Sequence, residues 1–207
     1  MRKLLFTVAI LLIAANLCAA DDLNPPLWRG LEGTTMTQWL FDTDSLAPPA
    51  DVENNPYNRD GTTAMMTVTG HGWYSEFGGR TGVWRLSGEM RAWLWNRPQP
   101  NPFKVIQVQV TWAPEDPALG GRPFVSELDE FGTGTGVVID ERPLELGWTL
   151  TTFQIIRQPN PPWEDVIISG DILVDQLVID TRCVPEPASL AALGFGLAGL
   201  LFSRRRR

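Results

Sequence analysis

The sequence predicts an all-β fold: an antiparallel, jelly-roll-like β-sandwich, with a signal peptide before it and a transmembrane helix after it. Three observations indicate this fold class. Apolar and polar residues alternate along several stretches, as they do in strands with one face on a core. The 207 residues include 19 glycines and 17 prolines, which interrupt long helices. Between residues 21 and 183 no amphipathic helical pattern is found.

Nine segments of the central region are expected to be strands. Residues 104–112 show the clearest alternation, with apolar side chains at the even positions from Ile106 onward. The odd positions Gln107, Gln109 and Thr111 are polar and are expected to face water. The other expected strands are residues 34–41, 62–69, 82–86, 90–95, 136–140, 148–157, 165–169 and 172–180. Turns rich in asparagine, glycine and proline separate them.

This many short strands in about 160 residues favours two packed antiparallel sheets. An immunoglobulin-like sandwich is the alternative, although the cysteine–tryptophan pattern of antibody domains is absent. The last expected strand, with Asp175 at the matching position, resembles the closing strand of jelly-roll carbohydrate-binding modules. That resemblance implies a sandwich able to hold a carbohydrate.

The first 20 residues have the three parts of a secretory signal peptide. Arg2 and Lys3 are followed by the apolar residues 4–15 and by small residues before Asp21. Cleavage is therefore expected after Ala20, which makes residues 21–183 an extracellular domain. The predicted mature chain contains a single cysteine, Cys183, so an intrachain disulfide is excluded. Cys183 is expected to have no role, or to pair with another chain.

The C-terminal 24 residues form a second targeting segment. Residues 188–202 are apolar or small, which is short for a bilayer but sufficient with flanking residues. An arginine cluster at the end keeps that side of the span in the cytoplasm, so the preceding domain faces outward. The two prolines just before the span keep the chain extended. These features are carried by Pro185, Glu186, Pro187, Arg204, Arg205, Arg206 and Arg207.

Residues 184–207 contain a proline signature, an apolar run and a basic end, in that order. In this arrangement they resemble the PEP-CTERM sorting signal of bacterial surface proteins. The resemblance implies recognition by an exosortase, a membrane transpeptidase that cuts near the signature. It also implies an inner-membrane intermediate with an outward-facing domain, in an envelope of Gram-negative type. Delivery to the cell surface or extracellular matrix then follows. A plain tail anchor that carries the signature by chance is the alternative.

The charge of the central domain limits the classes of molecule that it is expected to bind. Residues 21–183 contain 23 acidic and 11 basic side chains, a net charge of −12. Without a basic patch to neutralise phosphates, nucleic acid is excluded as a partner. No cofactor is expected. A structural calcium ion is compatible with so many carboxylates, but no Asp-x-Asp-x-Asp-Gly loop assigns its ligands.

The residues needed for common catalytic sites are scarce. His71 is the single histidine, in an expected turn, and no Gly-x-Ser-x-Gly elbow is present. Carboxylates are plentiful, and a glycosidase needs two of them roughly 5–9 Å apart. The sequence offers several carboxylate clusters and selects none of them: Glu127/Asp129/Glu130, Asp140/Glu141, Glu164/Asp165 and Asp171/Asp175/Asp180. We therefore expect a protein that is not an enzyme, with a glycoside hydrolase or lyase as the alternative.

Tryptophan is the other candidate binding group. Trp93 and Trp95 are two residues apart, so on a strand they share a face on which sugar rings could stack. Core packing of this pair is the competing interpretation. Trp73 and Tyr74 flank a glycine turn and are candidate lining residues of a loop site. The expected function is a surface or matrix protein that binds extracellular polysaccharide; a structural matrix protein without a small ligand is the alternative.

Overall fold

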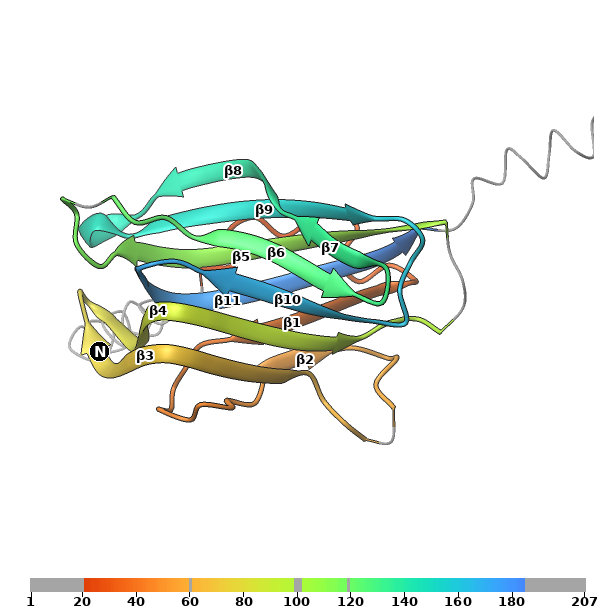
Figure 1. Cartoon of the computed structure of the whole chain (residues 1–207), viewed down its shortest axis with the longest axis horizontal. Helices are drawn as coiled ribbons and strands as arrows, with labels where there is room; N and C mark the ends of the chain where they lie inside the picture. The colour runs from red at the N-terminus through yellow and green to blue at the C-terminus, as the bar shows by residue number, and fades with distance from the viewer. Residues whose placement is uncertain (1–20, 60, 99–101, 119, 185–207) are drawn as a thin grey trace, which may run out of the picture.

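The computed structural model describes residues 21–59, 61–98, 102–118 and 120–184 (Figure 1). All regular structure in these ranges is β-strand, apart from the 3-10 turn η2 (Glu145–Gly147). The predicted all-β, antiparallel fold is confirmed. The eleven strands are β1 (Thr34–Trp39), β2 (Val52–Asn54), β3 (Met65–Phe77), β4 (Arg80–Trp95), β5 (Phe103–Pro114), β6 (Phe124–Asp129), β7 (Gly132–Thr135), β8 (Val137–Pro143), β9 (Thr149–Arg157), β10 (Trp163–Ser169) and β11 (Ile172–Val184).

Both predicted targeting segments lie outside the described residues. Within the ranges given above, no helix has the length and apolarity needed to span a bilayer. The signal peptide and the C-terminal transmembrane helix therefore stay predictions from the sequence.

The strands form one continuous sheet, where two separate sheets were expected. The order is β7-β6-β10-β4-β11-β5-β9-β8, with β1 and β2 added beside β11 and β3 beside β4. Strand β4 makes the sheet continuous, because its first part pairs with β11 and its last part with β10. The sheet curls so that β10 and β6 lie in front of β11 and β5, and the result is nearly closed, like a barrel (Figure 1).

Glycines lie at two close approaches in this curled sheet. A Cβ on Gly88 of β4 would lie 2.3 Å from the Thr69 carbonyl oxygen, at the point where β4 passes from β11 to β10. A Cβ on Gly134 of β7 would lie 3.0 Å from Ile155 of β9, where the first strand of the order meets the opposite layer. At Gly88 only glycine leaves room for the Thr69 backbone, whereas at Gly134 a larger residue would have to displace neighbouring side chains.

Strand lengths differ from the sequence prediction around the β3–β4 hairpin. Segments expected as three short strands are two long ones, and His71 lies inside β3 beside a bulge, where a turn was expected. Strands β2, β6 and β7 were not predicted. Glu127 and Asp129 occupy buried positions of β6, and β7 reads Gly-Thr-Gly-Thr, so neither strand shows an apolar alternation.

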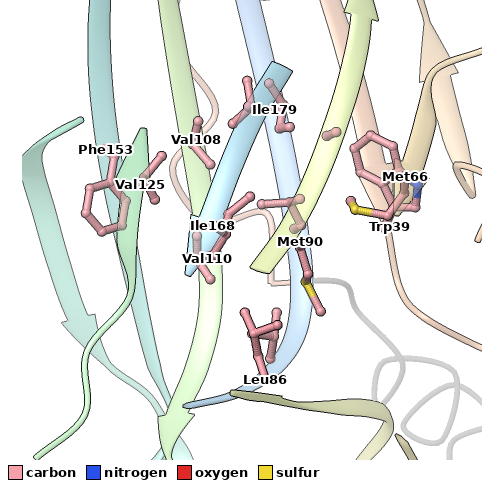
Figure 2. Packing of buried hydrophobic residues seen from close by; sticks show 14 of the residues in the cluster. Trp39, Met66, Leu86, Met90, Val108, Val110, Val125, Phe153, Ile168 and Ile179 are labelled. Atoms are coloured by element: carbon pink, nitrogen blue, oxygen red, sulfur yellow. The ribbon is translucent and has the colours of Figure 1, made fainter. Parts of the chain in front are cut away.

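The core lies between the two layers and draws side chains from most strands. Figure 2 shows Trp39 and Met66 at one side and Phe153 with Val125 at the other, with Val108, Val110, Ile168 and Ile179 between them. Trp84 and Trp112 are buried in the same cluster. This continuous apolar cluster is the main source of stability of the fold.

An N-terminal strap, residues 21–33, covers the outer face of β5, β9 and β11. The polar side of β5 was expected to face water, but Gln109 is only 1% exposed. The Asn24 backbone N–H donates to Gln109 Oε1 over 2.9 Å, and Gln107 Nε2 donates to the Asn24 carbonyl over 2.7 Å. The strap thus converts a polar outer face into a second, hydrogen-bonded interior.

Candidate functional site

Strand β4 presents two tryptophans on its outer face. Met90, Ala92 and Leu94 are buried in the core, whereas Arg91, Trp93 and Trp95 alternate with them and are half-buried. Trp93 and Trp95 therefore share a face, as their spacing indicated, and that face is the outer one. The indole centroids are 4.3 Å apart and the ring planes meet at 71°, an edge-to-face arrangement.

Trp95 is held in place by the loop between β2 and β3. Its indole N–H donates to Thr62 Oγ1 over 2.9 Å, and the Arg59 guanidinium lies 4.7 Å from the ring centroid. Asn55 Nδ2 also donates to the Trp95 carbonyl. With one ring face covered and its N–H occupied, Trp95 supports Trp93 and leaves Trp93 as the ring available to a ligand.

A cleft of about 610 Å³ opens beside Trp93. The strand register sets its composition: Met65 of β3 and Asp165 of β10 lie directly opposite Trp93 on either side. Arg91 lies two residues before Trp93, on the same face of β4. Its Nη2 is 2.8 Å from Asp165 Oδ2. The cleft also includes Pro48, Pro49 and Thr67. It therefore combines an aromatic and aliphatic wall with a guanidinium–carboxylate pair.

Arg91 carries two acidic neighbours. Its Nη1 is 3.8 Å from Glu89 Oε1, in addition to the closer contact with Asp165. The three side chains together carry a net charge of −1. Groups of this kind donate and accept hydrogen bonds with hydroxyl groups but repel an anion.

The structure does not bring Trp73 and Tyr74 to this cleft. Trp73 lies opposite Trp84 and Trp93 lies nine residues further along β4, roughly 30 Å away at the rise of a strand. As neighbours on β3, the two aromatic side chains point to opposite faces. Trp73 packs against the core and its indole N–H donates to the Phe41 carbonyl over 2.9 Å; Tyr74 is exposed and contacts Phe77. The expected shared loop site at these residues is not formed.

Sequence reasoning missed the other residues of the cleft. Arg91 shares the face of Trp93 by the same period of two, so a search for polar neighbours of the pair could have found it. Met65 and Asp165 are 28 and 72 residues from Trp93 in the chain. Their position depends on strand register, which leaves no local signal in one sequence.

Several of the carboxylates considered for acid–base chemistry are enclosed. Glu127, Asp129 and Glu164 face the interior at the end of the fold where β11 ends. Burial, and secondarily the charge of Asp129, raise the pKa of Glu127 to about 8. Arg157 lies 2.8 Å from Glu127 but directs its N–H groups to Asp129, whose pKa is lowered by these hydrogen bonds even though burial opposes it.

Asp175 is also enclosed by the fold and paired with an arginine. It is the extra residue at a bulge of β11, nearly buried, and 3.2 Å from Arg80 Nη1. Burial raises the pKa of Asp175 to about 6, and the nearby Arg80 opposes that rise. In the part of the chain that the structure describes, no three His, Cys, Asp or Glu side chains gather in a way that could hold a metal ion.

Cys183 is buried near the end of β11, and its Sγ lies 3.3 Å from Asn160 Oδ1. Burial raises the pKa of the thiol. Because only the thiolate is nucleophilic, a buried, protonated Cys183 does not fit the suggested pairing with another chain.

The fold and this surface define an all-β domain with a tryptophan-lined cleft on its outer face. The segment that follows the domain indicates how the protein is sorted. Residues 184–207 match the PEP-CTERM protein-sorting motif. The resemblance seen in the sequence is thereby confirmed, and the motif supports an exported protein that an exosortase sorts to the cell surface. No curated protein and no solved structure matches the chain.

Proposed function

We propose that this protein is an exported cell-surface or extracellular-matrix protein that binds a neutral polysaccharide in the cleft at Trp93, without catalysing a reaction. The observation that supports this proposal most directly is the position of Trp93, on the outer face of β4 and at the wall of a cleft. The sorting motif supports the location, because it directs the domain to where polysaccharides are found.

Carbohydrate is the ligand class that suits this cleft chemically. A sugar ring has an apolar face of C–H groups, which packs on an indole, and a rim of hydroxyls, which needs donors and acceptors. Trp93 supplies the first, and Arg91 with Asp165 supplies the second. The acidic balance of Arg91, Glu89 and Asp165 favours neutral sugars over uronic acids or sulfated sugars.

Trp93→Ala is expected to weaken binding of a neutral polysaccharide at least tenfold, about 1.4 kcal/mol, because the stacking surface is lost. Affinity electrophoresis and calorimetry, with the producer's own exopolysaccharide and a neutral glucan as probes, measure this change. Tyr74→Ala is the matched control, since it removes another outer-face aromatic of the same hairpin. Equal affinity in the two variants, or tighter binding of alginate than of glucan, would contradict the proposal.

The alternatives predict different results in the same experiments. A structural matrix protein without a small ligand would bind none of the polysaccharides. A hydrolase would release new reducing ends from a bound polysaccharide, and substitution of a carboxylate would abolish that release.

Processing at the sorting motif is expected to depend on an exosortase. In cells with the enzyme, the intact mass of the mature protein should end near Pro185–Pro187, and the protein should be in the outer envelope or matrix. In cells without it, Arg204–Arg207 should remain and the protein should stay in the inner membrane. Whole-protein mass spectrometry of cell fractions measures both. Retention of Arg207 in both strains would show that the tail is a permanent anchor.

A further inference from the structure

The last described strand reaches the first residue of the sorting motif. Strand β11 continues to Val184, which is paired with Phe103 of β5, and the motif match starts at the same residue. Only Pro185, Glu186 and Pro187 separate this strand from the predicted anchor, residues 188–202. At full extension the four steps from Val184 to the first anchor residue span about 14 Å.

This short connection limits the distance of the domain from a bilayer. The headgroup region is about 5–8 Å thick on each side of the hydrocarbon core. With the first anchor residue at the edge of the hydrocarbon core, Val184 can therefore lie at most about 6–9 Å beyond the headgroup region, which keeps this end of the domain next to the membrane surface. No longer linker exists that would let the domain move away.

The end of the domain at Val184 presents apolar and aromatic side chains. Pairing of Lys104 with both Cys183 and Arg157 puts the ends of β11 and β9 together, and Arg157 binds Asp129 beside the β6–β7 turn. The tip of β11, the tip of β9 and this turn lie at one end of the molecule (Figure 1). We call the apolar side chains there the exit surface: Phe103, Phe131, Ile156 and Trp163. Phe131 is 52% exposed and Ile156 is 62% exposed; the other two are half-buried.

We propose that the exit surface docks on the outer leaflet of the membrane in the anchored form of the protein, with Phe131 at the headgroup level. This inference rests on the anchored intermediate of the proposed function. Aromatic side chains favour the membrane–water interface, and apolar side chains gain free energy when they leave water there. The domain thus stands on the membrane, and the three-residue connection that carries the signature is held at the membrane surface, where a membrane enzyme works.

The buried polar residues behind the exit surface keep this end folded. The side chains of Lys104 and Glu164 form an ion pair that excludes water, and Asn96 binds both. The Cys183 backbone N–H donates to the Gly33 carbonyl over 2.9 Å, and its side chain contacts Asn160. The last residues of β11 are therefore fixed to three other segments, and fraying of β11 would not lengthen the connection at low cost.

The test uses the full chain, purified from cells without exosortase and reconstituted in vesicles. An environment-sensitive fluorophore is attached at Phe131→Cys or, as matched control, at Leu146→Cys. Leu146 is 77% exposed and lies in η2, beside the β3–β4 turn at the other end of the domain. Cys183 is buried and reacts poorly in the folded protein. Nitroxide lipids are expected to quench the label at 131 at least threefold more than the label at 146, and iodide in the buffer to do the reverse.

A third variant tests the geometric reason. Insertion of ten glycine and serine residues after Val184 should reduce the difference between the two labels, since the domain can then leave the surface. Equal quenching at 131 and 146 with the native connection would overturn the proposal. A chain that does not float with the vesicles would overturn both the anchor and the docking. Polysaccharide binding at Trp93 is measured separately, so its failure is distinguishable from either result.

Discussion

Lys104→Met is expected to destabilise the domain by about 3–5 kcal/mol, because it leaves Glu164 as a buried charge without a partner. Both side chains are 0% exposed, and Lys104 Nζ lies 2.5 and 2.6 Å from the two Glu164 oxygens. Asn96 contacts both groups, and its Nδ2 also donates to the Pro161 carbonyl over 2.9 Å. Urea unfolding of the exported domain at neutral pH measures the change in the free energy of unfolding.

Two further variants identify the cause of this loss. Arg142→Met removes a cation from an exposed pair with Asp140 and should cost less than about 1 kcal/mol. Lys104→Met combined with Glu164→Leu removes both charges of the buried pair and should recover much of the stability. If Lys104→Met were no more harmful than Arg142→Met, the buried pair would not contribute in the way the structure implies.

Arg29→Met is expected to destabilise the domain by about 3 kcal/mol at pH 8, by releasing the N-terminal strap. The Arg29 guanidinium makes two contacts with the Asp180 carboxylate, at 2.6 and 2.7 Å, and also binds Asp22 within the strap. The side chain of Asp180 is completely buried, so loss of Arg29 leaves a carboxylate without its cation. The pKa of Asp180 is already raised by burial, with Arg29 opposing that rise.

The pH dependence of this variant follows from the direction of that pKa. Without Arg29 the folded-state pKa of Asp180 rises further above its unfolded value, so the missing stability is largest above the folded-state pKa. The deficit should shrink as the pH falls to 5, because a protonated Asp180 is no longer a buried charge. Arg29→Met with Asp180→Asn should show little pH dependence of the deficit. Equal deficits at pH 5 and pH 8 in the single variant would contradict this explanation.

The strap lies away from the candidate site, so substitutions in the strap test the stability of the domain separately from ligand binding. It covers β5, β9 and β11, whereas the cleft at Trp93 lies on the outer face of β3, β4 and β10. Variants of the strap should therefore change the free energy of unfolding and leave polysaccharide affinity unchanged in the folded fraction. The exit surface adjoins the candidate site at Trp163, which pairs with Trp95, but Phe131 lies in the turn after β6; stability, binding and membrane docking can therefore be examined with different substitutions.

Local pattern alone determined several features of this protein. The alternation in residues 104–112 is a property of one strand, and it predicted β5 (Phe103–Pro114) to within two residues at each end. The shared face of Trp93 and Trp95 follows from a period of two. The sorting signal, from Pro185 to Arg207, is read as a linear order of residues and needs no tertiary structure.

Tertiary structure decided everything that depends on segments far apart in the chain. The alternation around Trp93 could not say which side of β4 meets the core, because both sides are rich in large side chains; the packing of Met90, Ala92 and Leu94 into the core cluster decided it. The alternation placed Gln109 on a water-facing side of its strand, but the strap, 85 residues earlier in the chain, covers it. Lys104 lies on the core side of its strand, which only Glu164, 60 residues later, makes tolerable. Period and composition describe a strand on its own, whereas register, burial and charge compensation belong to pairs of segments, so they are set only when the chain folds.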